Sequence, residues 1–122
     1  MFAAILLAAG IATFTGVQPQ LAAGGGAVYV TFAAGDVISV ARSTDAGATF
    51  ASPVALPEAG RLALGKRRGP RIAATAQAVV VAAVAGARGG GADGDLVLYR
   101  STDQGRTWTA PIVVNDVPGA AR

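Results

Sequence analysis

Short apolar runs separated by turn residues fill most of this chain. In the first half they cover residues 20–23, 27–33, 37–42 and 50–56, and they are rich in Val and Ala. Runs of this length, bounded by Gly, Pro or Asp, are typical of β-strands. The 17 Gly and six Pro residues recur every few positions and leave little room for helices. We therefore predict an all-β chain.

The second half of the sequence repeats the order of the first. Each half reads Pro-x-Leu/Ile-Ala-Ala, a Val-rich run, a Gly/Asp turn, a second Val-rich run, an STD-G-T-aromatic segment and a Pro-containing run. Pro19 and Pro70 are 51 positions apart, whereas Ser43 and Ser101 are 58 apart. The difference of seven residues lies in the turn at residues 86–95. A repeated strand scaffold tolerates an insertion that is confined to one turn.

Each repeat therefore offers four strands, within residues 18–58 in the first unit and 69–116 in the second. Four strands in a repeat of this length correspond to one blade of a β-propeller. Propellers typically have four to eight blades, so two blades cannot close a ring. We predict that residues 18–122 form about two antiparallel blades of an incomplete propeller. The remaining blades would belong to a longer chain or to an assembly.

The two most similar segments are RSTDAGATF and RSTDQGRTW. Their pattern, Ser-x-Asp-x-Gly-x-Thr-Phe/Trp, resembles the Asp-box, the bacterial neuraminidase repeat found in sialidases and other propellers. The matching residues are Ser43, Asp45, Gly47, Thr49, Phe50, Ser101, Asp103, Gly105, Thr107 and Trp108. Asp accepts hydrogen bonds in a turn, Ser and Thr hold it, Gly supplies a positive φ and the aromatic ring buries surface. We expect these residues to build a turn and not to carry catalysis.

The direction of each strand decides which turns share an end of the blade. The Asp-box-like segments join strands three and four, so residues 33–36, 86–95 and the link at 58–71 are predicted at the opposite end. The sialidase resemblance implies an active site at that end, with Arg side chains holding the substrate carboxylate and an Asp donating a proton. The catalytic candidates in this chain are Arg71 and Asp93.

The match to the family pattern is partial at Arg71. Many sialidases start this blade with Arg-Ile-Pro, whereas Ala73 follows Ile72 here. A solvated loop between blades is the alternative interpretation of the basic link. Tyr29 and Tyr99 lie within predicted strands, where packing explains them better than nucleophilic catalysis. The other charged residues predicted at this end are Asp36, Arg61, Lys66, Arg67, Arg68, Arg88 and Asp95.

Composition narrows the chemistry further. The chain has no Cys and no His, which excludes Ser-His-Asp and Cys-His catalysis, disulfides and the usual zinc sites. The chain has a net charge of +3, but no aromatic residues are interleaved with its basic residues as they are on a nucleic-acid-binding surface. No nucleic-acid partner is therefore predicted. No cofactor or metal is predicted either, because Asp93 and Asp95 fall short of the six to eight oxygens that calcium needs.

Residues 1–17, MFAAILLAAGIATFTGV, form an uncharged apolar leader. The leader resembles the core of a secretory signal peptide without its basic start, and predicts a secreted, periplasmic or cell-envelope protein. A buried first strand, or a start codon placed upstream of the true signal, is the alternative.

The leading functional hypothesis is part of a sialidase-like (exo-α-sialidase or neuraminidase family) Asp-box propeller that acts on or binds anionic glycans. The chain alone is expected to be inactive. One alternative is a non-enzymatic propeller that binds glycans or proteins. Another is a glycosidase of a different Asp-box family, with paired carboxylates.

Overall fold

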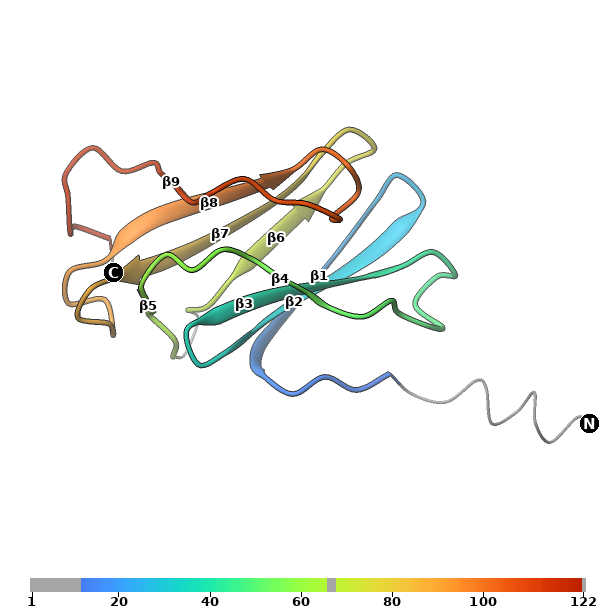
Figure 1. Ribbon diagram of the computed structural model, residues 1–122, viewed down its shortest axis with the longest axis horizontal. Coiled ribbons are helices and arrows are strands. Elements are labelled where there is room, and N and C mark those ends of the chain that lie inside the picture. The colour runs from blue at the N-terminus through green and yellow to red at the C-terminus, as the bar shows by residue number, and fades with distance from the viewer. Residues whose placement is uncertain (1–11, 66–67, 122) are drawn as a thin grey trace, which may run out of the picture.

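The computed structural model describes residues 12–65 and 68–121, and within them it contains two antiparallel β-sheets (Figure 1). The first sheet, blade one, has the spatial order β1-β2-β3-β4. Its strands are β1 (Val17–Gly24), β2 (Ala27–Ala34), β3 (Val37–Ser43) and β4 (Val54–Ala55). In the described part of the chain, no helix is long and apolar enough to cross a membrane.

The second sheet, blade two, has the order β5-β7-β8-β9, and β6 also pairs with β7. Its strands are β5 (Arg61–Leu62), β6 (Arg71–Ala74), β7 (Val79–Gly86), β8 (Asp95–Ser101) and β9 (Ile112–Val113). Strand β5 lies inside the segment that the sequence pattern assigned to the link. It pairs with the C-terminal end of β7. The pairing forms because two apolar residues of the link, Leu62 and Ala63, are buried there against the core.

The strand registers repeat between the blades. Val28 pairs with Ser43 in blade one, and Val79 pairs with Ser101 in blade two. The first partners are therefore 51 positions apart and the second partners 58, as the sequence repeat predicts. The prediction of an all-β fold with antiparallel, propeller-like blades is confirmed: blade one has the four predicted strands, and blade two has those four and β5.

The outermost strands are shorter than predicted. Strand β4 has two residues, whereas the apolar run covers residues 50–56. Pro53 directly precedes β4, and Pro111 directly precedes β9. Proline has no N–H to donate, so the ladder of backbone hydrogen bonds is interrupted at both positions. Single bonds continue it on both sides, from Ala51 N to Arg42 O at 2.9 Å and from Leu56 N to Ile38 O at 2.8 Å.

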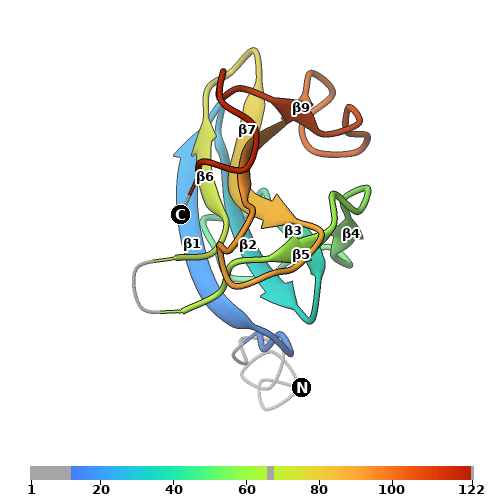
Figure 2. The same ribbon diagram turned by 90° about the vertical axis from the view of Figure 1, so that its left-hand side faces the viewer.

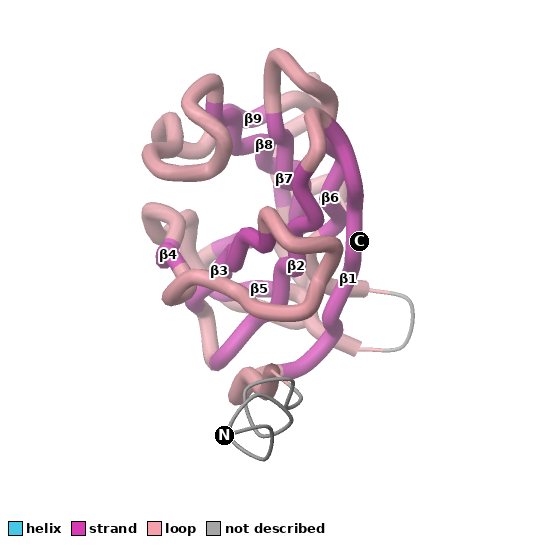
Figure 3. Tube along the Cα trace, turned by 90° about the vertical axis from the view of Figure 1, so that its right-hand side faces the viewer, coloured by secondary structure: helices cyan, strands magenta, loops and turns pink. Residues whose placement is uncertain are grey.

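The two blades pack face to face around one apolar core and fan out from their inner strands (Figures 2 and 3). Strands β1 and β6 lie side by side on the inner edge, while β4 and β9 lie farther apart. The core between the sheets includes Tyr29 and Ile38 of blade one and Val81, Val97 and Tyr99 of blade two. A fan of sheets that meet at their inner strands is the arrangement of neighbouring propeller blades.

A second, smaller cluster covers the other face of blade one. Phe14 stacks on Phe32 with ring centroids 5.2 Å apart and meets Phe50 edge-on at 5.6 Å. The buried members of this cluster are Val30, Phe32 and Ala41. Phe14 of the predicted leader therefore packs on the blade and Val17 begins β1, whereas residues 1–11 lie outside the described residues. The signal peptide stays a prediction.

One hydrogen bond between the blades offers a test of this packing. The Tyr99 hydroxyl donates to the Pro57 carbonyl at 2.7 Å, and the Tyr99 side chain is 1% exposed. We expect Tyr99→Phe to lower the free energy of unfolding by about 1 kcal/mol, because the carbonyl loses its donor. Tyr29→Phe is the matched control: Tyr29 is equally buried and its hydroxyl has no bond to any described residue. Equal losses in urea unfolding would contradict the prediction.

Candidate functional site

The segment at residues 43–50, here called the first repeated turn, is closed by its own side chains. The Ser43 hydroxyl donates to Asp45 Oδ1 at 2.7 Å and accepts the Gly47 N–H at 2.9 Å. The Asp45 carboxylate also accepts the Thr49 N–H at 2.8 Å and the Thr49 hydroxyl. Each polar residue of the motif is therefore engaged inside the turn.

The second repeated turn, residues 101–108, forms the same bonds. Ser101 donates to Asp103 at 2.8 Å and accepts the Gly105 N–H at 2.8 Å, while Asp103 accepts the Thr107 N–H at 2.9 Å. Trp108 adds a bond from its indole N–H to Gly105 O at 3.1 Å. This turn also reaches the neighbouring blade, because Gly105 lies against the ring of Tyr29.

The hydrogen bonds lower the pKa of both turn carboxyls. Bonds from the Thr49 hydroxyl, the Thr49 N–H and the Ser43 hydroxyl lower the pKa of Asp45 to about 2. The equivalent bonds from Thr107 and Ser101 lower that of Asp103 to about 2. A carboxyl that stays ionised at such low pH cannot act as a general acid near neutral pH. The geometry therefore suits turn building and gives these residues no proton to donate.

The turns at the opposite ends of the blades converge with the link between them. Leu62 N donates to the carboxylate of Asp36, in the turn between β2 and β3, at 2.9 Å. Arg68 donates to Gly90 O, in the long turn of blade two, at 2.9 Å. These contacts bring together one end of each blade, which we call the far end because it lies opposite the repeated turns (Figure 1).

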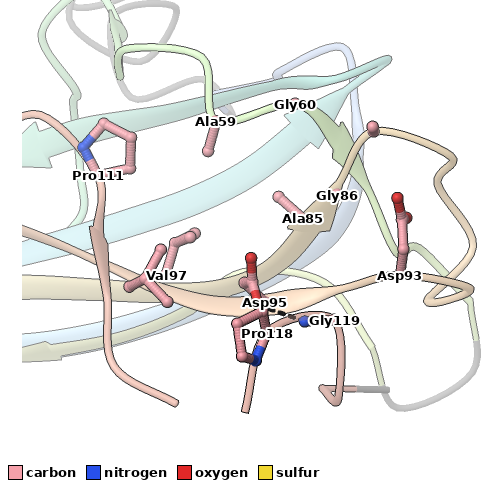
Figure 4. Close-up of a pocket in the computed structure, with 12 residues that line it drawn as sticks. Ala59, Gly60, Ala85, Gly86, Asp93, Asp95, Val97, Pro111, Pro118 and Gly119 are labelled. Carbon is pink, nitrogen blue, oxygen red and sulfur yellow. Dashed lines mark hydrogen bonds between the residues drawn. The ribbon is translucent and has the colours of Figure 1, made fainter. Parts of the chain in front are cut away.

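A pocket of about 620 Å³ opens at the far end, between blade two and the link (Figure 4). Its walls are mostly small or apolar residues, and among the described residues its charged members are Asp93 and Asp95. The lining residues are Ala59, Gly60, Ala85, Gly86, Ala87, Asp93, Asp95, Val97, Pro111, Val113, Pro118 and Gly119. The volume is within the range of pockets that take small molecules.

Asp93 is held by the inserted turn. Its two carboxylate oxygens accept the Arg88 N–H at 3.0 and 3.2 Å. The carboxylate also lies so close to Gly86 that a Cβ there would sit 2.5 Å from Asp93 Oδ1. Gly86 is therefore required for Asp93 to pack into this turn.

Asp95 is held by a segment that the sequence did not identify. Its Oδ1 accepts the Asn115 side-chain N–H at 2.9 Å and the Gly119 N–H at 2.8 Å, and these bonds lower the pKa of Asp95. Asn115 in turn accepts the Leu96 N–H at 2.7 Å. Asp95 Oδ2 accepts no bond from the described part of the chain, and the side chain lies between Val97 and Asp93 at the pocket (Figure 4). Asp95 therefore offers one acceptor oxygen at the pocket.

The two catalytic candidates do not share a pocket. Arg71 begins β6 and lines a cavity of about 150 Å³ together with Val84 and Leu96. Asp93 lines the larger pocket with Ala85. Because neighbouring residues of a strand point to opposite faces, the cavity and the pocket lie on opposite sides of blade two. Lys66 and Arg67, also predicted at this end, lie outside the described residues.

The bonds within the repeated turns predict their acid stability. The pKa of Asp45 and of Asp103 lies at about 2 in the folded chain, against an ordinary 3.8. The contribution of the two carboxylates to the free energy of unfolding is therefore fully present above about pH 4 and is lost as the pH falls toward 2. We expect Thr49→Val to raise the pKa of Asp45 and leave Asp103 unchanged in a ¹³C NMR titration of the side-chain carboxyls. An Asp45 that titrates near 3.8 in the unmodified chain would contradict the turn geometry.

The glycines of the two repeated turns provide a matched pair of substitutions. Gly47 and Gly105 have φ of 89° and 83°, which strains any other residue by about 1–2 kcal/mol. A Cβ on Gly47 meets nothing within 4 Å, whereas one on Gly105 lies 3.3 Å from the buried Tyr29 ring. Gly105→Ala should therefore lower the free energy of unfolding more than Gly47→Ala does. Equal losses in urea unfolding would show that the second turn does not support the contact between blades.

Comparison with known proteins places the fold. No family model matches the chain, and no curated protein matches its sequence. Among solved structures, xylan β-1,4-xylosidase from Bacillus halodurans C-125 is similar at a TM-score of 0.53 and 13% identity, over 82% of this chain and 21% of that protein. The chain thus spans about one fifth of the xylosidase. At this identity the likeness supports the propeller-like β fold alone.

Proposed function

We propose that this chain is part of a sialidase-like propeller, that its two repeated turns are Asp-boxes, and that it binds anionic glycans at the far end. The observation that carries the proposal is the separation of roles along each blade. Both complete Ser-x-Asp-x-Gly-x-Thr-aromatic segments form turns at one end of the blades, and their polar side chains are hydrogen-bonded within those turns. The pocket with Asp93 and Asp95 lies at the other end, next to the Arg-bearing link.

The chemistry of the far end supports a glycan as ligand. Sugars are held by carboxylate and backbone acceptors against small or flat walls, and this pocket combines Asp95 Oδ2 with Ala, Gly and Pro residues. The guanidinium groups of Arg61, Arg68 and Arg88 belong to the same end and suit a carboxylate on the sugar. A similar fold occurs in a protein named as a xylosidase, so the fold itself is compatible with a glycan as ligand.

Neither tyrosine suits the nucleophile role of a sialidase-type hydrolytic site, and Asp95 does not suit the role of proton donor. Tyr29 and Tyr99 are 2% and 1% exposed, so neither is available as a nucleophile. Burial and the charge of Glu58 raise the pKa of Tyr99, which further disfavours the phenolate. The lowered pKa of Asp95 keeps it ionised, so it accepts hydrogen bonds and does not donate a proton. Hydrolysis by the proposed propeller therefore needs groups on further blades.

A second candidate, a binding platform without enzyme activity, is favoured by one observation. Each far-end carboxylate, including that of Asp36, binds N–H groups of its own chain. A carboxylate that is held in this way can still accept a hydrogen bond from a ligand at a free oxygen, and it does so without acting as an acid, base or nucleophile.

The test is an NMR titration of the chain with sialyllactose and, as the matched sugar, lactose. We expect amide shifts in residues 86–95 and 115–119 with sialyllactose, with a dissociation constant on the order of 1 mM, and no release of sialic acid. Arg88→Ala should weaken this binding several-fold, whereas Arg106→Ala removes the same charge from the repeated-turn end and should have no effect.

Three outcomes of this titration would count against the proposal. Shifts confined to the repeated turns would place the ligand at the wrong end of the blades. Equal responses to the two sugars would remove the anionic, sialidase-like specificity and favour the platform. Release of sialic acid by the chain alone would contradict the requirement for further blades.

A further inference from the structure

The side of blade two that points away from blade one, here called the outer face, exposes apolar side chains. Leu96, Ile112 and Val114 are 38%, 49% and 50% exposed. Other residues of this face alternate along β7 and β8 with residues buried against blade one. They are Val80, Ala82, Val84 and Leu98. The outer face is therefore a continuous apolar surface over three strands.

Blade one buries the equivalent face. The strand registers and the flanking bonds make Ile38 the equivalent of Leu96, and Leu56 the equivalent of Val114. Ile38 and Leu56 are only 2% and 3% exposed, because both belong to the core between the blades. The same repeated surface is thus an interface in blade one and an open face in blade two.

A polar contact accompanies the apolar one. Across the interface, Arg42 of β3 donates to the side chain of Gln104 at 2.9 Å. Gln104 has a φ of 64° and lies in the second repeated turn, beside Gly105. Arg100 is the repeat equivalent of Arg42, and its exposed guanidinium has no bond to any described residue. Arg100 therefore occupies the position of the interface donor Arg42, but no acceptor equivalent to Gln104 faces it in the described part of the chain.

The chain leaves the two blades in a similar way. In blade one, Asp36, directly before β3, accepts the N–H of Leu62, in the segment that leads into blade two. In blade two, Asp95, the first residue of β8, accepts the N–H of Gly119. The strand registers make Gly94 the repeat equivalent of Asp36, and Gly119 lies 58 positions after Arg61, so acceptor and donor are each displaced by one residue. Residues 117–121 are therefore held on blade two close to the position at which the link is held on blade one.

We propose that the outer face of blade two binds a further blade of the same repeat, whose turn presents a hydrogen-bond acceptor to Arg100 at the position of Gln104. The inference rests on the part of the proposed function that requires further blades, and it involves no glycan. A second copy of this chain fits less well. Its blade one carries Ala46 at the acceptor position, and Phe14 covers the face that would dock.

The experiment lengthens the chain by one blade. A second copy of residues 59–116 is joined after Asp116, because Asp116 is the repeat equivalent of Glu58 and the phase of the link is kept. The added blade carries Gln104 and the face that already docks on blade one. We expect a single cooperative thermal transition with a midpoint above that of the original chain, because the added blade buries the outer face.

The same substitution at two positions provides the control. Leu98→Glu in the original blade two should abolish the gain in midpoint, whereas Leu98→Glu in the added blade lies on a new open face and should change it little. Arg100→Ala in the original blade and Gln104→Ala in the added one should show a coupling of about fivefold to tenfold in the docking equilibrium constant.

Three results would overturn the inference. They are a separate transition for the added blade, equal effects of Leu98→Glu at both positions, and self-association of the original chain through Leu98 in sedimentation at micromolar concentration. The last would make a second copy the occupant. The sialyllactose titration of the original chain is independent of all three, so failure of glycan binding and failure of blade docking are distinguishable.

Discussion

A four-stranded sheet with apolar side chains on both faces is not stable in water until each face is covered by another layer. In this chain one such contact is complete. The sheets of blades one and two meet around Tyr29, Ile38, Val81, Val97 and Tyr99, and every other feature is positioned by that contact. It places the inner strands side by side, the repeated turns at one end and the inserted turn with the link at the other. The remaining two faces show what happens without a neighbour: Phe14 covers one, and the other is open.

The repeated turns contribute to this arrangement through local chemistry. The third strand must reverse to reach the fourth, and the N–H groups at the bend would lack partners without the Ser and Asp side chains. The Ser and Asp side chains of both turns are hydrogen-bonded inside the turn. The ionised carboxylates of the motif are therefore occupied by structural bonds and are not available for catalysis. The value of the motif is geometric, since it fixes the direction of each strand and so distinguishes the two ends of the blade.

Local patterns predicted most of the fold, and long-range contacts account for what they missed. The Val-rich runs and the shift from 51 to 58 positions between repeats gave the strands and their registers, because a repeat constrains both copies at once. Nothing local indicates that Leu62 pairs with β7, or that Asn115 and Gly119 reach back to Asp95. The structure places Arg71 and Asp93 at separate pockets on opposite sides of blade two. Only the alternation of side chains along a folded strand reveals this separation.

The difference between the two blades is concentrated at the far end. In both blades an Asp next to the start of the third strand accepts an N–H of the segment that follows, although Asp36 and Asp95 differ by one position in the repeat. In blade two, however, the seven extra residues add Asp93, which the turn holds through Arg88 N and the space at Gly86. Strand cores must repeat to pack against one another, whereas turns are free to diverge at little cost in stability. The residues that distinguish one blade from another therefore accumulate where the sheet does not restrict them, and in this chain they line the pocket.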